Sequence, residues 1–238
     1  LTPELEAKIV AADTKQGLED LYLPYRPKRR TLAAIAREAG LEPLALKLFE
    51  NPGLDPETEA VAFVSPEKNV PDVKAALNGA RDILAEKMSE DSVLLADMRA
   101  WLWNEGAMTS RVVEGMEETG AKFRDYFDYR EPIARMPSHR ALAAFRGQTE
   151  GVLTLGLEVD AERPDQPVER TAAYFNVGTR GRPADAWLWQ CCRWTWRVKL
   201  RASLEAEVFD RLREAAEGAA IDVFGTNLRD LLLAAPAG

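Results

Sequence analysis

The sequence is poor in the residues that build metal and nucleophile sites, with one histidine, His139, and two cysteines, Cys191 and Cys192, among 238 residues. One histidine excludes a His-rich metal site and leaves any Cys/His or Ser/His/Asp arrangement dependent on a single side chain. His139 follows Pro137-Ser138 in the first turn of an expected helix, where local capping is its expected role. The cysteines are neighbours in an expected helix and point in different directions, so we expect reduced thiols.

Other motifs of catalysis are missing from the sequence as well. It contains no phosphate loop of the G-x-x-x-x-G-K-S/T or G-x-G-x-x-G kind, and no apolar run approaches the ~20 residues of a membrane span. The carboxylates in residues 122–131 favour ion pairs over a metal site, because arginines lie between them. The basic glycine turn at 178–182 is either a connector or an anion contact through backbone N–H groups. We therefore expect no catalytic site, no metal and no cofactor, and a cytoplasmic, non-enzymatic protein.

The charge balance is acidic overall, with a formal net charge of −8. This argues against a chain that binds polyanions over its whole surface, because phosphate contacts need concentrated lysine and arginine. The positive charge is nevertheless clustered at residues 26–30 and 193–201, whereas the acidic residues are spread along the chain. The acidic balance therefore does not exclude a local basic surface.

Helical periodicity dominates the pattern of apolar residues and predicts an all-α, multihelical fold. Apolar residues recur at steps of three and four through 71–88 and 94–102, and again from 204 to 212 and from 221 to 232. Residues 151–160 alternate apolar with small or polar residues, which predicts at most a short β-ribbon there. No second convincing strand is found nearby, so its partner is left open. A boundary inside the 1–238 region is expected near 148–166.

The first candidate site is the segment from Tyr22 to Arg30, in which two prolines hold the chain extended. Its phenol rings suit stacking on bases and its cations suit phosphate contacts, as in proteins that bind single strands. The alternative is an extended connector with packed tyrosines and solvated cations. The candidate residues are Tyr22, Tyr25, Arg26, Lys28, Arg29 and Arg30.

The second candidate site is the helix expected from residue 184 to about 202, which carries four of the six tryptophans. Arg193, Arg197 and Arg201 recur at steps of four beside these indoles, an arrangement suited to phosphate contact with base stacking. The alternative is a helix buried on most sides. In that case an apolar stripe of Trp187, Cys191, Trp194 and Val198 faces the core.

Three separated stretches resemble the Tex family, bacterial transcription-accessory proteins that bind nucleic acid. They are residues 18–31 (LEDLYLPYRPKRRT), 120–129 (GAKFRDYFDY) and 231–238 (LLLAAPAG). The resemblance implies the N-terminal and central helical region of a multidomain protein. The family's helix-turn-helix start and its RNase H-like, helix-hairpin-helix and OB-fold RNA-binding domains would lie outside these residues. The first residue, Leu1, and the apolar end of the chain also lead us to expect a piece of a longer polypeptide.

The resemblance implies a helical scaffold of a nucleic-acid-binding transcription accessory protein, with an auxiliary basic surface. The expected partner is RNA or DNA, bound mainly through domains outside this chain, with contact to the backbone and little readout of bases. The alternative is a protein-interaction platform that docks RNA polymerase or an associated factor, which the acidic balance suits. A parent protein that is a nuclease has no support within these residues.

Overall fold

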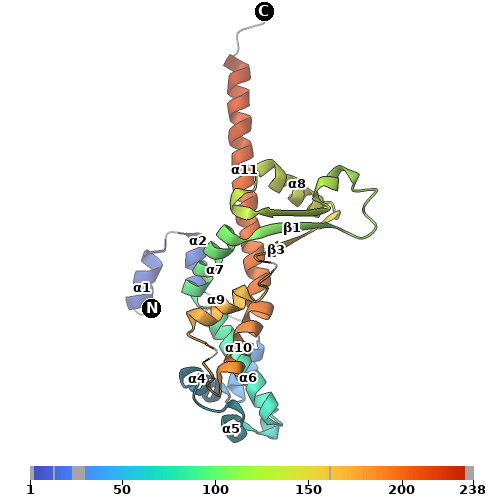
Figure 1. Cartoon of the computed structure of the whole chain (residues 1–238). Helices are drawn as coiled ribbons and strands as arrows, with labels where there is room; N and C mark the ends of the chain where they lie inside the picture. Colours follow the sequence, from blue (N-terminus) through green and yellow to red (C-terminus); the bar gives the residue numbers. More distant parts are fainter. Residues whose placement is uncertain (1–2, 13, 23–29, 161, 179, 234–238) are drawn as a thin grey trace, which may run out of the picture. The chain divides into compact units, whose positions relative to one another are not determined.

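The computed structural model describes residues 3–12, 14–22, 30–160, 162–178 and 180–233 (Figure 1). By its internal contacts the chain divides into two compact units. Unit 1 comprises residues 1–98 and 165–202, and unit 2 comprises residues 99–164 and 203–238. Helices α7 (Ser92–Glu105) and α11 (Arg201–Leu233) each contribute residues to both units.

The regular secondary structure in the described residues of unit 1 is helical, apart from one isolated β-bridge between Ser65 and Val70. Its remaining elements are α1 (Pro3–Val10), α2 (Lys15–Tyr22), α3 (Leu32–Glu38), α4 (Glu42–Glu50), α5 (Pro56–Ala60), η2 (Val61–Phe63), η3 (Pro66–Lys68), α6 (Val73–Ser89), α9 (Gln166–Tyr174), α10 (Asp185–Trp194) and η6 (Thr195–Leu200).

Helix α6 lies at the centre of unit 1 and packs against α3, α4, α5 and α10. It begins after Asp72, whose carboxylate accepts the N–H of Ala75 at 2.7 Å and so satisfies one unpaired donor of the first turn. The expected periodicity of 71–88 is confirmed, because Ala76, Ala80, Ile83, Leu84 and Met88 are at most 1% exposed. The buried face of α6 therefore follows directly from the spacing in the sequence.

A short π-helix, η6, breaks the regular spacing of buried residues after α10. Thr195 and Leu200 are both buried although they are five residues apart, and Val198 between them is 53% exposed. The Thr195 hydroxyl donates to the carbonyl of Cys191 at 2.8 Å, a bond that competes with the backbone ladder. The expected apolar stripe that ended at Val198 is therefore wrong at that residue, since the π-turn shifts the register by one residue.

Unit 2 contains a three-stranded antiparallel sheet of order β2-β1-β3, built from β1 (Ala107–Val112), β2 (Asp128–Pro132) and β3 (Leu153–Glu158). The expected strand at 151–160 is confirmed as β3. Its partner β1 pairs Ala107 with Glu158 and Val112 with Leu153, although no second strand was expected. The other elements of this unit are η4 (Ala121–Tyr126), η5 (Ile133–Arg135) and α8 (Ser138–Thr149), of which α8 packs against β3.

The expected multihelical fold is confirmed, and the β structure is a small three-stranded antiparallel sheet where at most a short ribbon near 151–160 was expected. Helix α11 is the longest element described, and four of its five buried residues, Leu204, Val208, Leu212 and Ala216, lie at steps of four. Among the described residues, no helix is long and apolar enough to cross a membrane.

Candidate nucleic-acid interface

The first candidate site lies mostly outside the described residues, which include only its two ends. Tyr25, Arg26, Lys28 and Arg29 belong to the stretch 23–29 that the structure does not describe. At the ends, Tyr22 closes α2 with its side chain 55% exposed, and Arg30 is exposed and pairs with Glu38 at 2.7 Å. The two ends of the segment are thus accessible to solvent.

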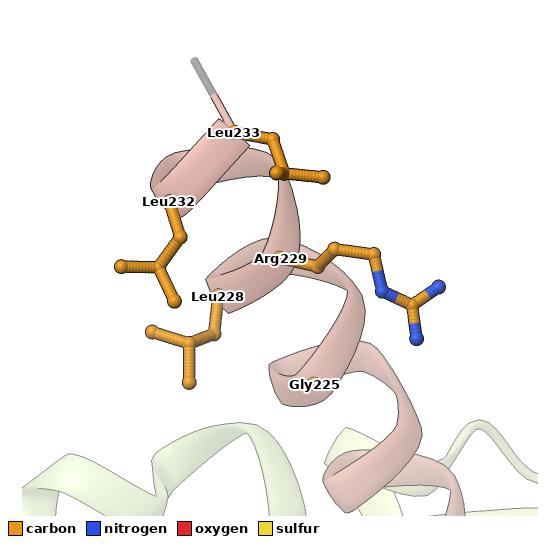
Figure 2. A pocket seen from close by; sticks show the side chains of 5 residues that line it. All are labelled: Gly225, Leu228, Arg229, Leu232 and Leu233. Atoms are coloured by element: carbon orange, nitrogen blue, oxygen red, sulfur yellow. The ribbon is translucent and has the colours of Figure 1, made fainter.

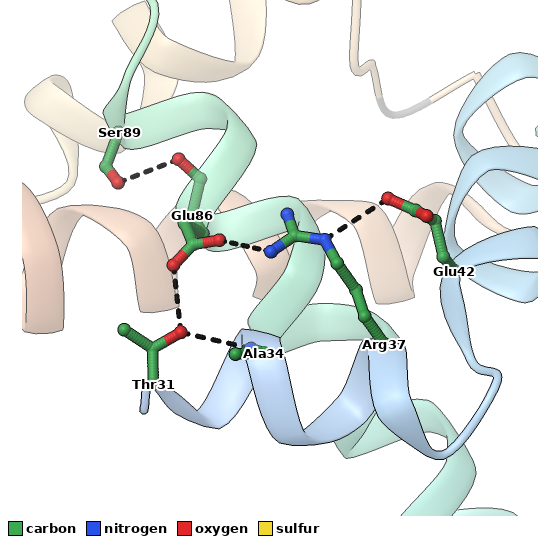
Figure 3. Close-up of polar contacts among 6 residues, drawn as sticks. All are labelled: Thr31, Ala34, Arg37, Glu42, Glu86 and Ser89. Carbon is green, nitrogen blue, oxygen red and sulfur yellow. Dashed lines mark hydrogen bonds and ion pairs between the residues drawn. The ribbon is translucent and has the colours of Figure 1, made fainter. Parts of the chain in front are cut away.

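The residue that follows this segment is fixed to unit 1 by a buried carboxylate. Thr31 caps α3 by accepting the N–H of Ala34 at 3.0 Å, and its hydroxyl donates to Glu86 Oε1 at 3.0 Å (Figure 3). Glu86 lies on α6, is 5% exposed, and also accepts from Arg37 at 2.5 Å. Burial opposes the charge on Arg37, but Glu86 and Glu42 outweigh it and raise the pKa of Arg37. This network holds the start of α3 against α6, next to the basic segment.

The second candidate site separates into a paired and an unpaired part. Arg193 forms an ion pair with Asp165 at 2.8 Å, which neutralises its charge locally. Arg197 and Arg201 are also exposed, and neither forms an ion pair with any residue that the structure describes. The structure therefore leaves two of the three arginines available to an external anion.

The tryptophans beside this site are engaged within unit 1. Trp187, Trp189 and Trp196 are partly buried and pack against the core, and the Arg81 guanidinium lies over the Trp194 ring at 3.9 Å from the centroid. Indoles held in this way are not free to stack on bases. The helix thus matches the alternative expected from the sequence, a largely buried element, on its tryptophan side.

The basic glycine turn binds a carboxylate of the protein itself. Asp185 Oδ2 accepts the backbone N–H groups of Arg180 at 2.8 Å and Arg182 at 3.0 Å, and Oδ1 accepts Arg182 Nε at 2.8 Å. Burial alone would raise the pKa of Asp185, but these hydrogen bonds keep it below its ordinary value. The donors that suggested an anion contact are therefore already used to close the turn onto α10.

The remaining titratable groups considered from the sequence are arranged structurally. Glu131 accepts from Arg140 at 3.1 Å, close to the edge-to-face pair of Tyr126 and Tyr129. His139 lies in the first turn of α8, which has no side-chain cap, so the capping role expected for it is wrong. The described residues contain no cluster of three or more His, Cys, Asp or Glu that could hold a metal ion.

The two cysteines are free thiols, as expected, and both are buried. Burial raises the pKa of Cys192 to about 12 and raises the pKa of Cys191 well above its usual value. A neutral, buried thiol is a poor nucleophile.

The fold is that of a mostly helical protein, and comparison with known proteins identifies its family. The sequence profile described as "Tex central region-like" matches residues 51–224, and the chain belongs to that family, which confirms the resemblance seen in its motifs.

The relatives include bacterial and animal proteins. The chain is 55% identical to "Protein tex" of Bordetella pertussis and 50% identical to "Transcriptional accessory protein Tex" of Neisseria gonorrhoeae; each match covers 100% of this chain and 31% of the relative. It is 26% identical to "S1 RNA-binding domain-containing protein 1" of Pongo abelii, over 94% of this chain and 23% of that protein. The chain therefore spans about a third or less of the length of these relatives.

Proposed function

We propose that the chain is a non-enzymatic helical scaffold of a nucleic-acid-binding transcription accessory protein, with an auxiliary basic surface of its own. The observation that carries the proposal is the pair Arg197 and Arg201, two exposed cations without an ion pair in the described part of a chain whose net charge is −8. The other candidate surface is the segment from Tyr22 to Arg30, most of which lies outside the described residues. The names of the relatives, which refer to transcription and to an RNA-binding domain, support the same assignment.

The proposed contact is made to the phosphate backbone rather than to the bases. Arginine donates several N–H groups to phosphate oxygens and remains charged at any physiological pH. Because the nearby indoles pack in the core or against Arg81, they do not provide a stacking platform. The scaffold therefore binds RNA or DNA with little sequence preference. In a protein of the relatives' length, other domains provide the main affinity.

The test is fluorescence anisotropy with labelled single-stranded RNA and duplex DNA at low salt, comparing the chain with the double variant Arg197→Gln/Arg201→Gln. Neutralising two phosphate contacts is expected to weaken binding by at least about tenfold. The matched control is Lys122→Gln/Arg146→Gln, which removes the same charge from two cations that already pair with Glu150.

The control is expected to change the affinity less than about twofold, since both of its cations already share the carboxylate of Glu150. A second variant that reverses the charge of Arg26, Lys28, Arg29 and Arg30 tests the other candidate surface. Equal losses in the control and in the Arg197/Arg201 variant would show that net charge, and not a site, governs binding. No binding at low salt would overturn the proposal and favour the docking platform instead.

A further inference from the structure

The π-turn η6 interrupts the regular helix that runs from α10 into α11. Thr195 and Leu200, five residues apart, are 0% and 1% exposed, and beyond them buried residues recur at steps of four, starting with Leu204. Between the two, Trp196 packs against the core and residues 197–199 are exposed. An α-helix one residue shorter would bury the same side chains, so core packing alone does not require the longer turn.

The order of the residues explains why the turn forms in this sequence. In an uninterrupted α-helix Lys199 would follow Thr195 by four residues and would lie on the same, buried face. Burial of an ammonium group is far costlier than burial of a leucine. The π-turn places Leu200 on that face instead and leaves Lys199 exposed. The wider turn therefore adds one position to the exposed side of the helix.

The same turn changes how Arg197 and Arg201 lie relative to each other. Four residues of α-helix advance by roughly 400°, which offsets the side chains of such a pair by about 40°. A π-turn advances less per residue, because its hydrogen bonds span five residues. Three of the four steps between the two arginines lie within η6, so the turn brings them close to one line along the exposed side of the helix.

The aligned pair has no acidic neighbour along its own helix. Residues 194–204 contain no aspartate or glutamate. Glu205, which follows Arg201 by four residues, accepts the backbone N–H of Leu157 at 3.3 Å. Within the described part of the chain neither arginine forms an ion pair. Two guanidinium groups, about one turn apart, thus face the solvent together.

An isolated exposed arginine elsewhere on α11 provides a contrast. Arg229 lines a shallow hollow with Gly225, Leu228, Leu232 and Leu233 (Figure 2). The residues four positions before and after it are Gly225 and Leu233, so no second cation lies in line with it. It also has no ion pair with any residue that the structure describes. Arg229 therefore matches the pair in exposure and charge but not in alignment.

We propose that η6 is a positioning element that aligns Arg197 and Arg201 on successive phosphates of one nucleic-acid strand. The inference rests on the proposed function and adds the arrangement of the ligand, because cations on one line follow one strand of the backbone. Guanidinium groups that are already aligned donate to both phosphates without rearrangement of the helix. π-turns of this kind recur at functional sites.

The test changes the alignment and keeps the charge. Deleting Val198 puts Thr195, Leu200 and Leu204 at steps of four and leaves the two arginines three residues apart, offset by about 60° in an α-helix. Arg197→Val/Val198→Arg exchanges two exposed neighbours and leaves the composition unchanged. Both variants retain the net charge of −8. Circular dichroism and thermal melting establish that each variant folds.

Binding to labelled single-stranded RNA is measured by fluorescence anisotropy across a salt series. In both variants we expect affinity at least about threefold weaker than in the parent chain. The salt slope is expected to become shallower by about 0.7, the value for one lost phosphate contact on a single strand. Val198→Ala, which keeps the residue and the spacing, and Arg229→Gln, which removes one isolated charge, are the controls. Each is expected to change the affinity less than about twofold.

The outcomes separate this inference from the proposed function. Parent-like affinity and slope in both alignment variants, with a loss in Arg197→Gln/Arg201→Gln, would overturn the alignment and leave the basic surface standing. If the deletion variant does not fold, the exchange variant decides alone. A loss in Val198→Ala or Arg229→Gln as large as in the alignment variants would also contradict the inference. No binding by the parent chain would overturn both proposals.

Discussion

Gly147 on α8 offers a sharp test of how closely the helix and the sheet of unit 2 pack. A Cβ atom at this position would lie 2.8 Å from Cγ of Leu153 and 3.3 Å from Cδ1 of Phe123. Both neighbours are buried, Leu153 at 3% and Phe123 at 5% exposure. Leu153 belongs to β3, so the contact is the one through which α8 meets the sheet. Only a residue without a side chain fits here without displacing the core.

The size of the effect follows from two opposing terms. Replacing glycine by alanine inside a helix stabilises it by about 0.8–1.0 kcal/mol. Forcing an extra methyl group into a packed core costs about 1–3 kcal/mol, and two buried neighbours closer than normal contact place Gly147→Ala in the upper part of that range. The expected net result is destabilisation by about 1–2 kcal/mol.

Gly218→Ala is the matched control, because Gly218 also lies in a helix of unit 2 and nothing is within 4 Å of its added Cβ. This variant is expected to gain about 0.5–1 kcal/mol. Urea denaturation followed by circular dichroism, with an unchanged slope against denaturant, measures both changes. A Gly147→Ala variant as stable as Gly218→Ala would refute the close packing of α8 on β3.

Three further outcomes are expected. Below about pH 4 the stability of the chain falls as Asp185 protonates, since its folded-state pKa lies below the unfolded value; Asp185→Asn flattens this part of a pH series of thermal melts. Deleting Val198, an exposed residue within the π-turn, keeps the helix content in circular dichroism and changes the free energy of unfolding by less than about 1 kcal/mol. Cys191 and Cys192 react with a thiol reagent only after unfolding, because both are buried with raised pKa values; fast reaction of the native protein would contradict their placement.

The helices were predictable from the sequence where apolar residues at helical spacing form a single face that packs on a hydrophobic core. The buried residues of α6 follow the 3.6-residue period of the sequence, and β3 follows its alternation. The other two strands were not predicted because neither shows a regular alternation of apolar and polar residues. Strand β1 contains Ser110 and Arg111, and β2 is a charged strand of five residues. Their pairing is stabilised by contacts distant in sequence, which local propensity does not contain.

Composition and spacing predicted which residues form the candidate sites, but not which of those residues form ion pairs within the protein. Spacing placed Arg193, Arg197 and Arg201 together, yet only the fold shows that Asp165 occupies the first of them. The π-turn was not predictable either, because its exposed residue Val198 is as apolar as the core residues near it. The cationic segment from Tyr22 to Arg30 remains a prediction from the sequence.

The central claim, that a discrete basic surface of this chain binds nucleic-acid phosphates, is tested most directly by the salt dependence of binding. The logarithm of the binding constant for duplex DNA is measured against the logarithm of salt concentration, for the chain and for Arg197→Gln/Arg201→Gln. Two lost phosphate contacts are expected to make the slope shallower by about 1.8, at about 0.9 per contact. An unchanged slope in the variant, or no binding at any salt concentration, would contradict the account.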